Sequence, residues 1–137
     1  MLDAATIAHW QGGSGNWSDL THWDIGVVPN NVGSKTYSAI IDLPASDPTV
    51  TVDMAVTISG LSNSEVVNVA SAKSLTVSGI VTNTGDLTAA GGTLRFSGAT
   101  VTNAARTIVA DGGIVEIKDS TIDGGVLRVL QWGRGRM

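Results

Sequence analysis

Apolar and polar residues alternate through most of this chain, and the alternation recurs at a regular interval. The segment 57–60 (Thr-Ile-Ser-Gly) returns at 76–79 (Thr-Val-Ser-Gly) and 95–98 (Arg-Phe-Ser-Gly), and loosely at 116–119. Residues two apart lie on one face of a strand, so each copy predicts a short strand with one buried face. A period of about 20 residues is typical of a solenoid, in which one small unit stacks on itself.

Aligning the repeats places apolar residues in four columns, two for each of two strands per repeat. The columns are Val56, Leu75, Leu94, Val115; Ile58, Val77, Phe96, Ile117; Val67, Leu87, Ile108, Leu127; and Val69, Ala89, Ala110, Val129. We expect these side chains to point inward and the residues between them to point outward. Arg95 and Glu116 then share an outward column one repeat apart, and we expect them to form an exposed ion pair.

Turn-forming residues recur between the strands. Gly60, Gly79 and Gly98 follow the first strand of each repeat, and a column of Asn63, Asn83, Asn103 and Asp123 recurs at equal steps. Gly and Asn accept left-handed backbone conformations, so these positions predict corners. Stacked Asn side chains also form hydrogen-bonded ladders. We therefore interpret this column as turn and ladder residues and not as a ligand site.

The spacing of the strands selects the fold class. No segment shows a helical 3.6-residue period, and about 20 residues separate equivalent strands, far more than a hairpin turn uses. The pattern predicts an all-β right-handed parallel β-helix of about four rungs, since parallel crossovers are right-handed. We divide the chain into an N-terminal cap with the first strands (1–49), the β-helix rungs (50–129) and an irregular tail (130–137).

Three of the four tryptophans, Trp10, Trp17 and Trp23, lie close together in the Gly-rich N-terminal segment. The first coil of a solenoid would expose apolar side chains and unpaired backbone, so its terminal segment is usually an atypical cap. Large indole rings can cover such an end. The alternative is a sugar-stacking platform that uses the same rings as glycan contacts. We favour the cap.

The same segment resembles a known family. Segments 10–19 (WQGGSGNWSD), 21–24 (THWD), 26–29 (GVVP) and 39–42 (AIID) are similar to the opening of bacterial secreted and surface β-helix proteins, including autotransporter passenger domains. His22 stands directly before Trp23, where these proteins more commonly have Asn. The resemblance covers the first third of the chain. It implies a β-helix and an extracellular or cell-surface location, but no particular activity.

The tail 130–137 breaks the alternation and has no amphipathic helix to cover the last rung. We interpret it as a foreign or frameshifted end of a chain whose repeats once continued, with a cap made by Trp132 as the less favoured alternative. An uncovered final strand presents a row of unpaired backbone groups. The pattern therefore predicts self-association through the C-terminal edge.

Composition excludes several functions. The net charge is −4, which does not suit a nucleic-acid partner, and the chain has no cysteine for disulfides or thiolate metal sites. No apolar run reaches the roughly 20 residues of a membrane span. The first ten residues lack the features of a signal peptide, so we expect either a cytosolic protein or a piece whose leader is missing.

No constellation of catalytic residues is visible. The two histidines, His9 and His22, lack metal-ligand spacing, and no column places two acids on neighbouring rungs as glycoside hydrolysis would need. We therefore predict a non-enzymatic module without cofactor or metal, with a structural or adhesive role and a host or matrix glycan or protein as partner. The alternatives are an N-terminal piece of a polysaccharide-active enzyme or phage tailspike, and a carbohydrate-binding module.

Overall fold

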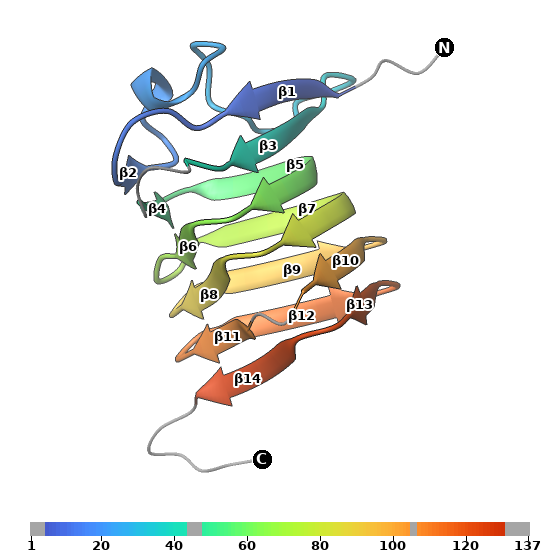
Figure 1. Cartoon of the computed structure of the whole chain (residues 1–137). Coiled ribbons are helices and arrows are strands. Elements are labelled where there is room, and N and C mark those ends of the chain that lie inside the picture. The colour runs from blue at the N-terminus through green and yellow to red at the C-terminus, as the bar shows by residue number, and fades with distance from the viewer. Residues whose placement is uncertain (1–4, 44–47, 105–106, 131–137) are drawn as a thin grey trace.

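Parallel pairing between strands of successive coils builds the stack (Figure 1). The computed structural model describes residues 5–43, 48–104 and 107–130. They form a β-solenoid of about four turns, which confirms the predicted fold class. The only helical element in these ranges is a short 3-10 turn, η1 (Leu20–His22), in the N-terminal segment.

The strands lie on three faces, which we call the first, second and third face in the order the chain visits them within a coil. The first face contains the beginnings of β5 (Ala55–Asn63) and β7 (Ser74–Asn83), then β9 (Thr93–Ser97) and β12 (Ile114–Lys118). The second contains β1 (Thr6–His9), β3 (Tyr37–Ile41), the ends of β5 and β7, β10 (Thr100–Asn103) and β13 (Thr121–Asp123). The third contains β2 (Gly15–Asn16), β4 (Thr49–Val52), β6 (Val66–Val69), β8 (Asp86–Ala90), β11 (Thr107–Asp111) and β14 (Val126–Leu130).

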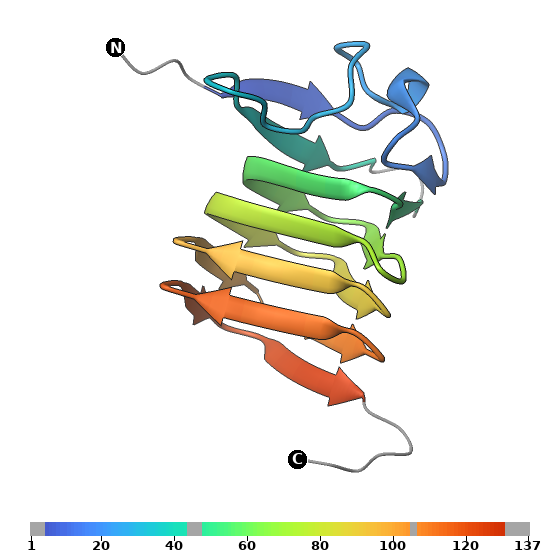
Figure 2. The same ribbon diagram turned by 180° about the vertical axis from the view of Figure 1, so that it is seen from behind.

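The two opposite views establish the hand of the winding. In Figure 1, β8, β11 and β14 run to the left at the front while β9 and β12 run to the right behind them, and the chain descends from N to C. Figure 2 shows β9 and β12 from their own side. The solenoid is therefore right-handed, as parallel crossovers almost always are.

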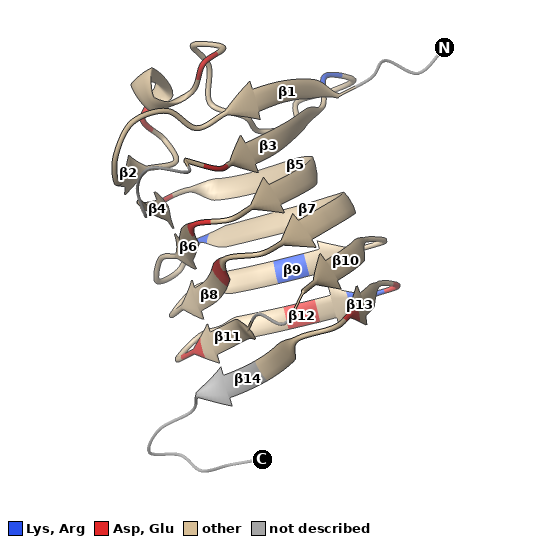
Figure 3. Ribbon diagram, in the orientation of Figure 1, with Lys and Arg blue, Asp and Glu red and all other residues tan. Residues whose placement is uncertain are grey.

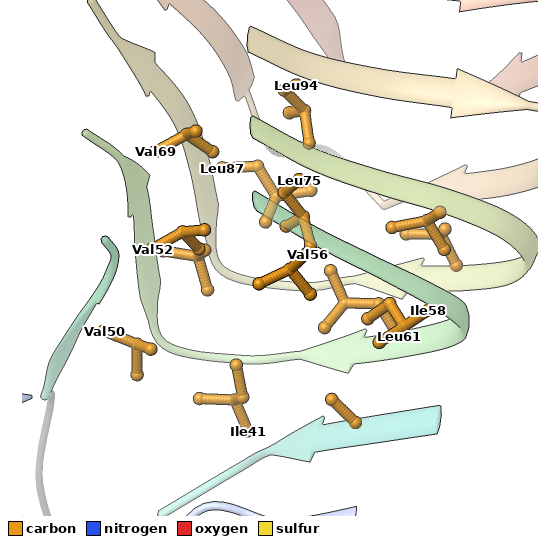
Figure 4. Close-up of a cluster of buried hydrophobic side chains, with 14 of the residues drawn as sticks. Ile41, Val50, Val52, Val56, Ile58, Leu61, Val69, Leu75, Leu87 and Leu94 are labelled. Carbon is orange, nitrogen blue, oxygen red and sulfur yellow. The ribbon is translucent and has the colours of Figure 1, made fainter. Parts of the chain in front are cut away.

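All four apolar columns are confirmed by the strand register. Val56 pairs with Leu75 and Leu75 with Leu94; on the third face Val67 pairs with Leu87 and Leu87 with Ile108. Before the last coil, the column side chains are at most 3 % exposed, and Figure 4 shows Val56, Leu87 and Leu94 among the side chains that fill the space between the faces. In the last coil, Ile117 and Leu127 are 42 % and 45 % exposed. The inward half of each strand therefore builds one continuous core along the axis of the stack.

The corner glycines differ from the prediction. The register places Gly60 opposite Ile80, and the pairing of β5 with β7 shifts between Ile58 and Gly60. Gly79 is therefore an inserted residue and not the equivalent of Gly60. A Cβ at Gly79 would lie 1.8 Å from the carbonyl oxygen of Ser59, so the close approach of the two coils requires glycine there.

The predicted asparagine ladder forms, and its side chains point into the core. The Asn63 amide donates to Asn83 Oδ1 at 3.1 Å, and the Asn83 amide donates to Asn103 Oδ1 at 2.8 Å. All three residues are buried. Asn63 Oδ1 also accepts the backbone N–H of Glu65 at 3.0 Å, and Asn83 Oδ1 that of Gly85 at 3.2 Å. The ladder therefore holds individual corners and also ties successive coils together.

Asp123 does not continue this ladder, which corrects the prediction. The register places Asp123 opposite Thr102 and not opposite Asn103, and the side chain of Asp123 is exposed. The last coils are also longer on the first face, where the paired residues Arg95 and Glu116 are 21 positions apart in the sequence. The constant step assumed for the column therefore misplaces its last member.

Charged residues are sparse on the stack (Figure 3). The expected pair between Arg95 of β9 and Glu116 of β12 is present. Both side chains are more than 40 % exposed, so the pair contributes at most about 1 kcal/mol. Backbone pairing and the buried columns, not surface charge, hold the coils together.

The ladder gives a stability prediction. Asn83→Ala removes the acceptor of the Asn63 amide and of the Gly85 N–H in a buried corner, so we expect a loss of about 2–4 kcal/mol in the free energy of unfolding. Thr82→Ala is the matched control, because Thr82 is the exposed neighbour, and it should change stability by less than about 0.5 kcal/mol. Urea unfolding measures both. Equal midpoints for the two variants would contradict a structural role for the ladder.

Candidate functional site

The three N-terminal tryptophans form one packed cluster beneath the irregular segment. Trp17 and Trp23 meet edge to face at 4.7 Å between ring centroids, and Trp10 and Trp23 at 5.1 Å. Each indole N–H donates to a backbone carbonyl at 3.0 Å: Trp10 to Gly13, Trp17 to Pro29, and Trp23 to Trp17. Their polar atoms are therefore satisfied within the cluster.

The burial of these rings favours one of their two predicted roles. Trp10, Trp17 and Trp23 are at most 2 % exposed, and the imidazole of His22 stacks on Trp10 at 4.3 Å. A sugar-stacking platform needs an accessible ring face. The burial of the three rings therefore favours the cap over the glycan contacts, and both assignments stay predictions.

The cap also satisfies the backbone edge of the first coil. Asn30 Oδ1 accepts the N–H of Thr57 at 2.9 Å, and the Asn30 amide donates to the carbonyl of Ala55 at 3.2 Å. The N–H of Asn31 donates to the carbonyl of Thr57 at 2.7 Å. Asn30 and Asn31 are not among the residues that the sequence pattern singled out. Their role depends on β5, a strand far downstream in the sequence, which no local signal reveals.

The carboxylates of Asp24 and Asp19 accept hydrogen bonds from other residues of the cap. The backbone N–H of His9 donates to Asp24 at 2.8 Å and lowers the pKa of the Asp24 carboxyl below its usual 3.8. The His9 ring lies 3.2 Å from the same carboxylate. The Thr21 hydroxyl donates to Asp19 at 2.6 Å and lowers the pKa of Asp19 in the same way. His9 contacts Asp24 and His22 stacks on Trp10, so both histidines have contacts within the cap.

A shallow hollow of about 490 Å³ lies on the outer surface of the second face, over β1, β3, β5 and β7. Its shape follows from one row of outward residues that the register brings side by side: Ile7, Ser38, Gly60 and Ile80. The two large side chains stand at the ends of the row and the two small residues lie between them. Because all four residues face outward on the same side of the sheet, the small residues between the two isoleucines leave a concave surface.

The chemistry of the hollow is uncharged and mixed. Its lining residues are Ile, Leu, Ala, Gly, Ser and Thr, with exposed methyl groups on Ile7 (51 %) and Ile80 (72 %). Ser38, Ser62 and Thr82 add hydroxyl groups. Ile80 is one of the most exposed large apolar residues of the described chain. Such a surface can contact a neutral partner through methyl and hydroxyl groups together.

Sequence reasoning missed this hollow. The one available signal was Ile80, which stands beside the inward Val81 and so breaks the strict alternation of the repeats. We assigned Gly60 and Gly79 to equivalent corners, and that alignment hid the outward position of Ile80. The contribution of Ile7 and Ser38 depends on pairing between β1, β3 and β5, whose spacing is irregular.

Other chemical groups in the described residues do not form a reactive cluster. Glu65 is buried, and its Oε2 accepts the N–H of Leu43 at 2.7 Å while its Oε1 has no hydrogen-bond partner. Within residues 5–43, 48–104 and 107–130, no three His, Asp or Glu side chains come together to bind a metal. No helix in these ranges is long and apolar enough to span a membrane. The tail after residue 130, including Trp132, lies outside the described residues.

Comparison with known proteins adds no further assignment. No protein-family model, curated protein or solved structure matches the chain. The resemblance of the opening segment to bacterial surface β-helix proteins therefore stays a prediction.

Burial of the tryptophans makes the two roles separable by experiment. Trp17→Ala removes a fully buried indole, so we expect it to lower the free energy of unfolding by about 3–5 kcal/mol. Denaturant unfolding with circular dichroism measures this loss. A folded variant of unchanged stability that loses glycan binding would overturn the cap and support the platform.

The Asp24 contact predicts an acid-dependent loss of stability. The folded pKa lies below the usual 3.8, so the contribution is complete above that pH and disappears as the pH falls through the folded pKa. Asp24→Asn keeps an acceptor for the His9 N–H but removes the titrating charge. We expect urea midpoints measured from pH 5 to pH 2 to fall less steeply in this variant than in the parent chain. Parallel curves would contradict the assignment.

Proposed function

We propose that this chain is a non-enzymatic structural and adhesive module of a secreted or cell-surface bacterial protein. The coils form a rigid support, and the hollow on the second face makes the contact with a host or matrix glycan or protein. The partner surface is uncharged, with hydroxyl and apolar groups that match the lining of the hollow.

The exposed position of Ile80 is the observation that carries the adhesive role. Exposing a large apolar side chain on a β-sheet face is unfavourable in water, and Thr fills the equivalent outward position in the next coil, where Thr100 pairs with Ile80. Ile7 stands at the opposite end of the same row, so the two apolar ends flank a floor of small and hydroxyl-bearing residues. An apolar contact residue combined with hydroxyl donors suits reversible binding to a neutral surface.

The structural role rests on the continuous core and the asparagine ladder. Each coil shares backbone pairing and apolar columns with its neighbours, and the ladder adds side-chain hydrogen bonds, so the stack resists bending between coils. The resemblance of the opening segment supports a location outside the cell. A rigid stack suits display of a contact surface away from a cell.

The test compares two exposed apolar residues of similar accessibility. Ile80→Asp places a charge in the hollow, whereas Val32→Asp places the same charge on the cap, where Val32 is 70 % exposed. The purified chain and both variants are coupled to fluorescent beads and applied to a neutral-glycan array and to immobilised matrix glycoproteins. We expect Ile80→Asp to reduce retention at least tenfold and Val32→Asp to leave it unchanged.

Three outcomes would overturn the proposal. They are no retention of the parent chain on any surface, equal retention of the two variants, and release of sugar products from polysaccharide substrates by the purified chain. The last result would favour a polysaccharide-active enzyme instead.

A further inference from the structure

The two ends of the solenoid are not alike. At the N-terminal end, Asn30 and Asn31 occupy the backbone groups of the first strand of the first face, and the tryptophan cluster covers the core. At the other end, β12, β13 and β14 each pair on one side only within the described residues. β1 and β2 are also edge strands at the N-terminal end, but the N–H and the carbonyl of His9 in β1 are both bonded to Asp24 of the cap. The C-terminal end is therefore the more open of the two for contact with a second copy.

The C-terminal end exposes the inward columns. Ile117 is 42 % exposed and Leu127 is 45 % exposed, whereas Phe96 and Ile108, their equivalents one coil earlier, are inaccessible to solvent. Among the described residues no further coil packs against these side chains, whereas the residue types and the register are those of the buried coils. A partner that covers this end must supply both strand edges and apolar side chains.

The free edge of β12 has a defined hydrogen-bond pattern. The N–H of Ile114 and the carbonyl of Lys118 both bond toward the preceding coil, each at 2.9 Å. Backbone groups alternate in direction along a strand, so those of Val115 and Ile117 point toward the open end. The edge can therefore pair with an antiparallel strand, and Ile117 of β12 then lies at a hydrogen-bonded position.

Charge selects the register of such a pairing. When Ile117 pairs with Ile117 of a second copy, Glu116 of each chain lies opposite Lys118 of the other, at the closely spaced non-hydrogen-bonded positions. When the strands shift so that residue 116 is central, Glu116 faces Glu116, and like charges directly opposite are destabilising. The edge is therefore self-complementary in one register.

We infer that the chain forms a two-fold symmetric tail-to-tail dimer in which β12 pairs antiparallel with β12 of a second copy, centred on Ile117. The two-fold axis makes the contact isologous and closes it at two copies. The exposed ends of the apolar columns, including Val115, Ile117 and Leu127, then cover one another. This assembly directs both N-terminal caps outward, at opposite ends of one longer stack.

A cysteine scan tests the centre of the contact, because the chain has no cysteine of its own. Residues at a two-fold pairing position have Cα atoms about 5.5 Å apart, within the range that a disulfide spans. Ile117→Cys should therefore convert most of the protein into a disulfide-linked dimer under mild oxidation. Ile80→Cys is the control, because Ile80 is more exposed but lies on the side of the stack. Equal cross-linking of the two variants would overturn the inference.

Charge reversal tests the register independently of the cysteine. Lys118→Glu places a second carboxylate opposite Glu116 of the other copy and leaves the pair of Arg95 with Glu116 in place. We expect it to weaken dimerisation at least tenfold in sedimentation velocity across a concentration series. The double variant Glu116→Lys, Lys118→Glu exchanges the charges and should restore the dimer. A monomeric parent chain at all concentrations, or unchanged dimerisation in Lys118→Glu, would refute the proposal.

Discussion

Every strand inside this molecule pairs in parallel with the coil before it and the coil after it. Each coil must therefore follow a similar backbone path, so that the ladder of hydrogen bonds continues, and must present side chains at its inward positions that pack against those of its neighbours. The apolar columns and the buried Asn63, Asn83 and Asn103 are consequences of this repetition. Gly79 shows how strict it is, because even one added carbon there would collide with the neighbouring coil.

The same pairing makes the two ends the critical parts of the molecule. A coil in the middle has its backbone satisfied by its neighbours, whereas a terminal coil needs another partner. At the N-terminal end that partner is local chain, in which Asn30 imitates a strand edge and three indoles cover the core. The C-terminal coil has the same register but no such cover among the described residues. We attribute a functional contact to this asymmetry, since an open strand edge is a template for pairing.

Function in such a molecule is confined to the outward positions, because stacking determines the inward ones. Many outward residues are Ser, Thr or Asn, and the second face departs from this where Ile7 and Ile80 flank Ser38 and Gly60. The departure produces the concave, uncharged surface to which we assign adhesion. The tryptophans are the largest apolar residues of the N-terminal segment, but they are buried, so we assign them to the cap and not to a binding surface.

The repeat pattern was sufficient to predict the fold class, the four apolar columns, the ladder of three asparagines and the pairing of Arg95 with Glu116. All of these follow from a regular period, which can be read without knowing which strand meets which. The folded chain was needed to show that Asp123 falls out of the ladder, that Gly79 is an insertion and that Asn30 closes the first strand edge. The hollow beside Ile80 also emerged only there. Each of these depends on register, and a one-residue change in coil length alters register without leaving a visible mark in a repeating sequence.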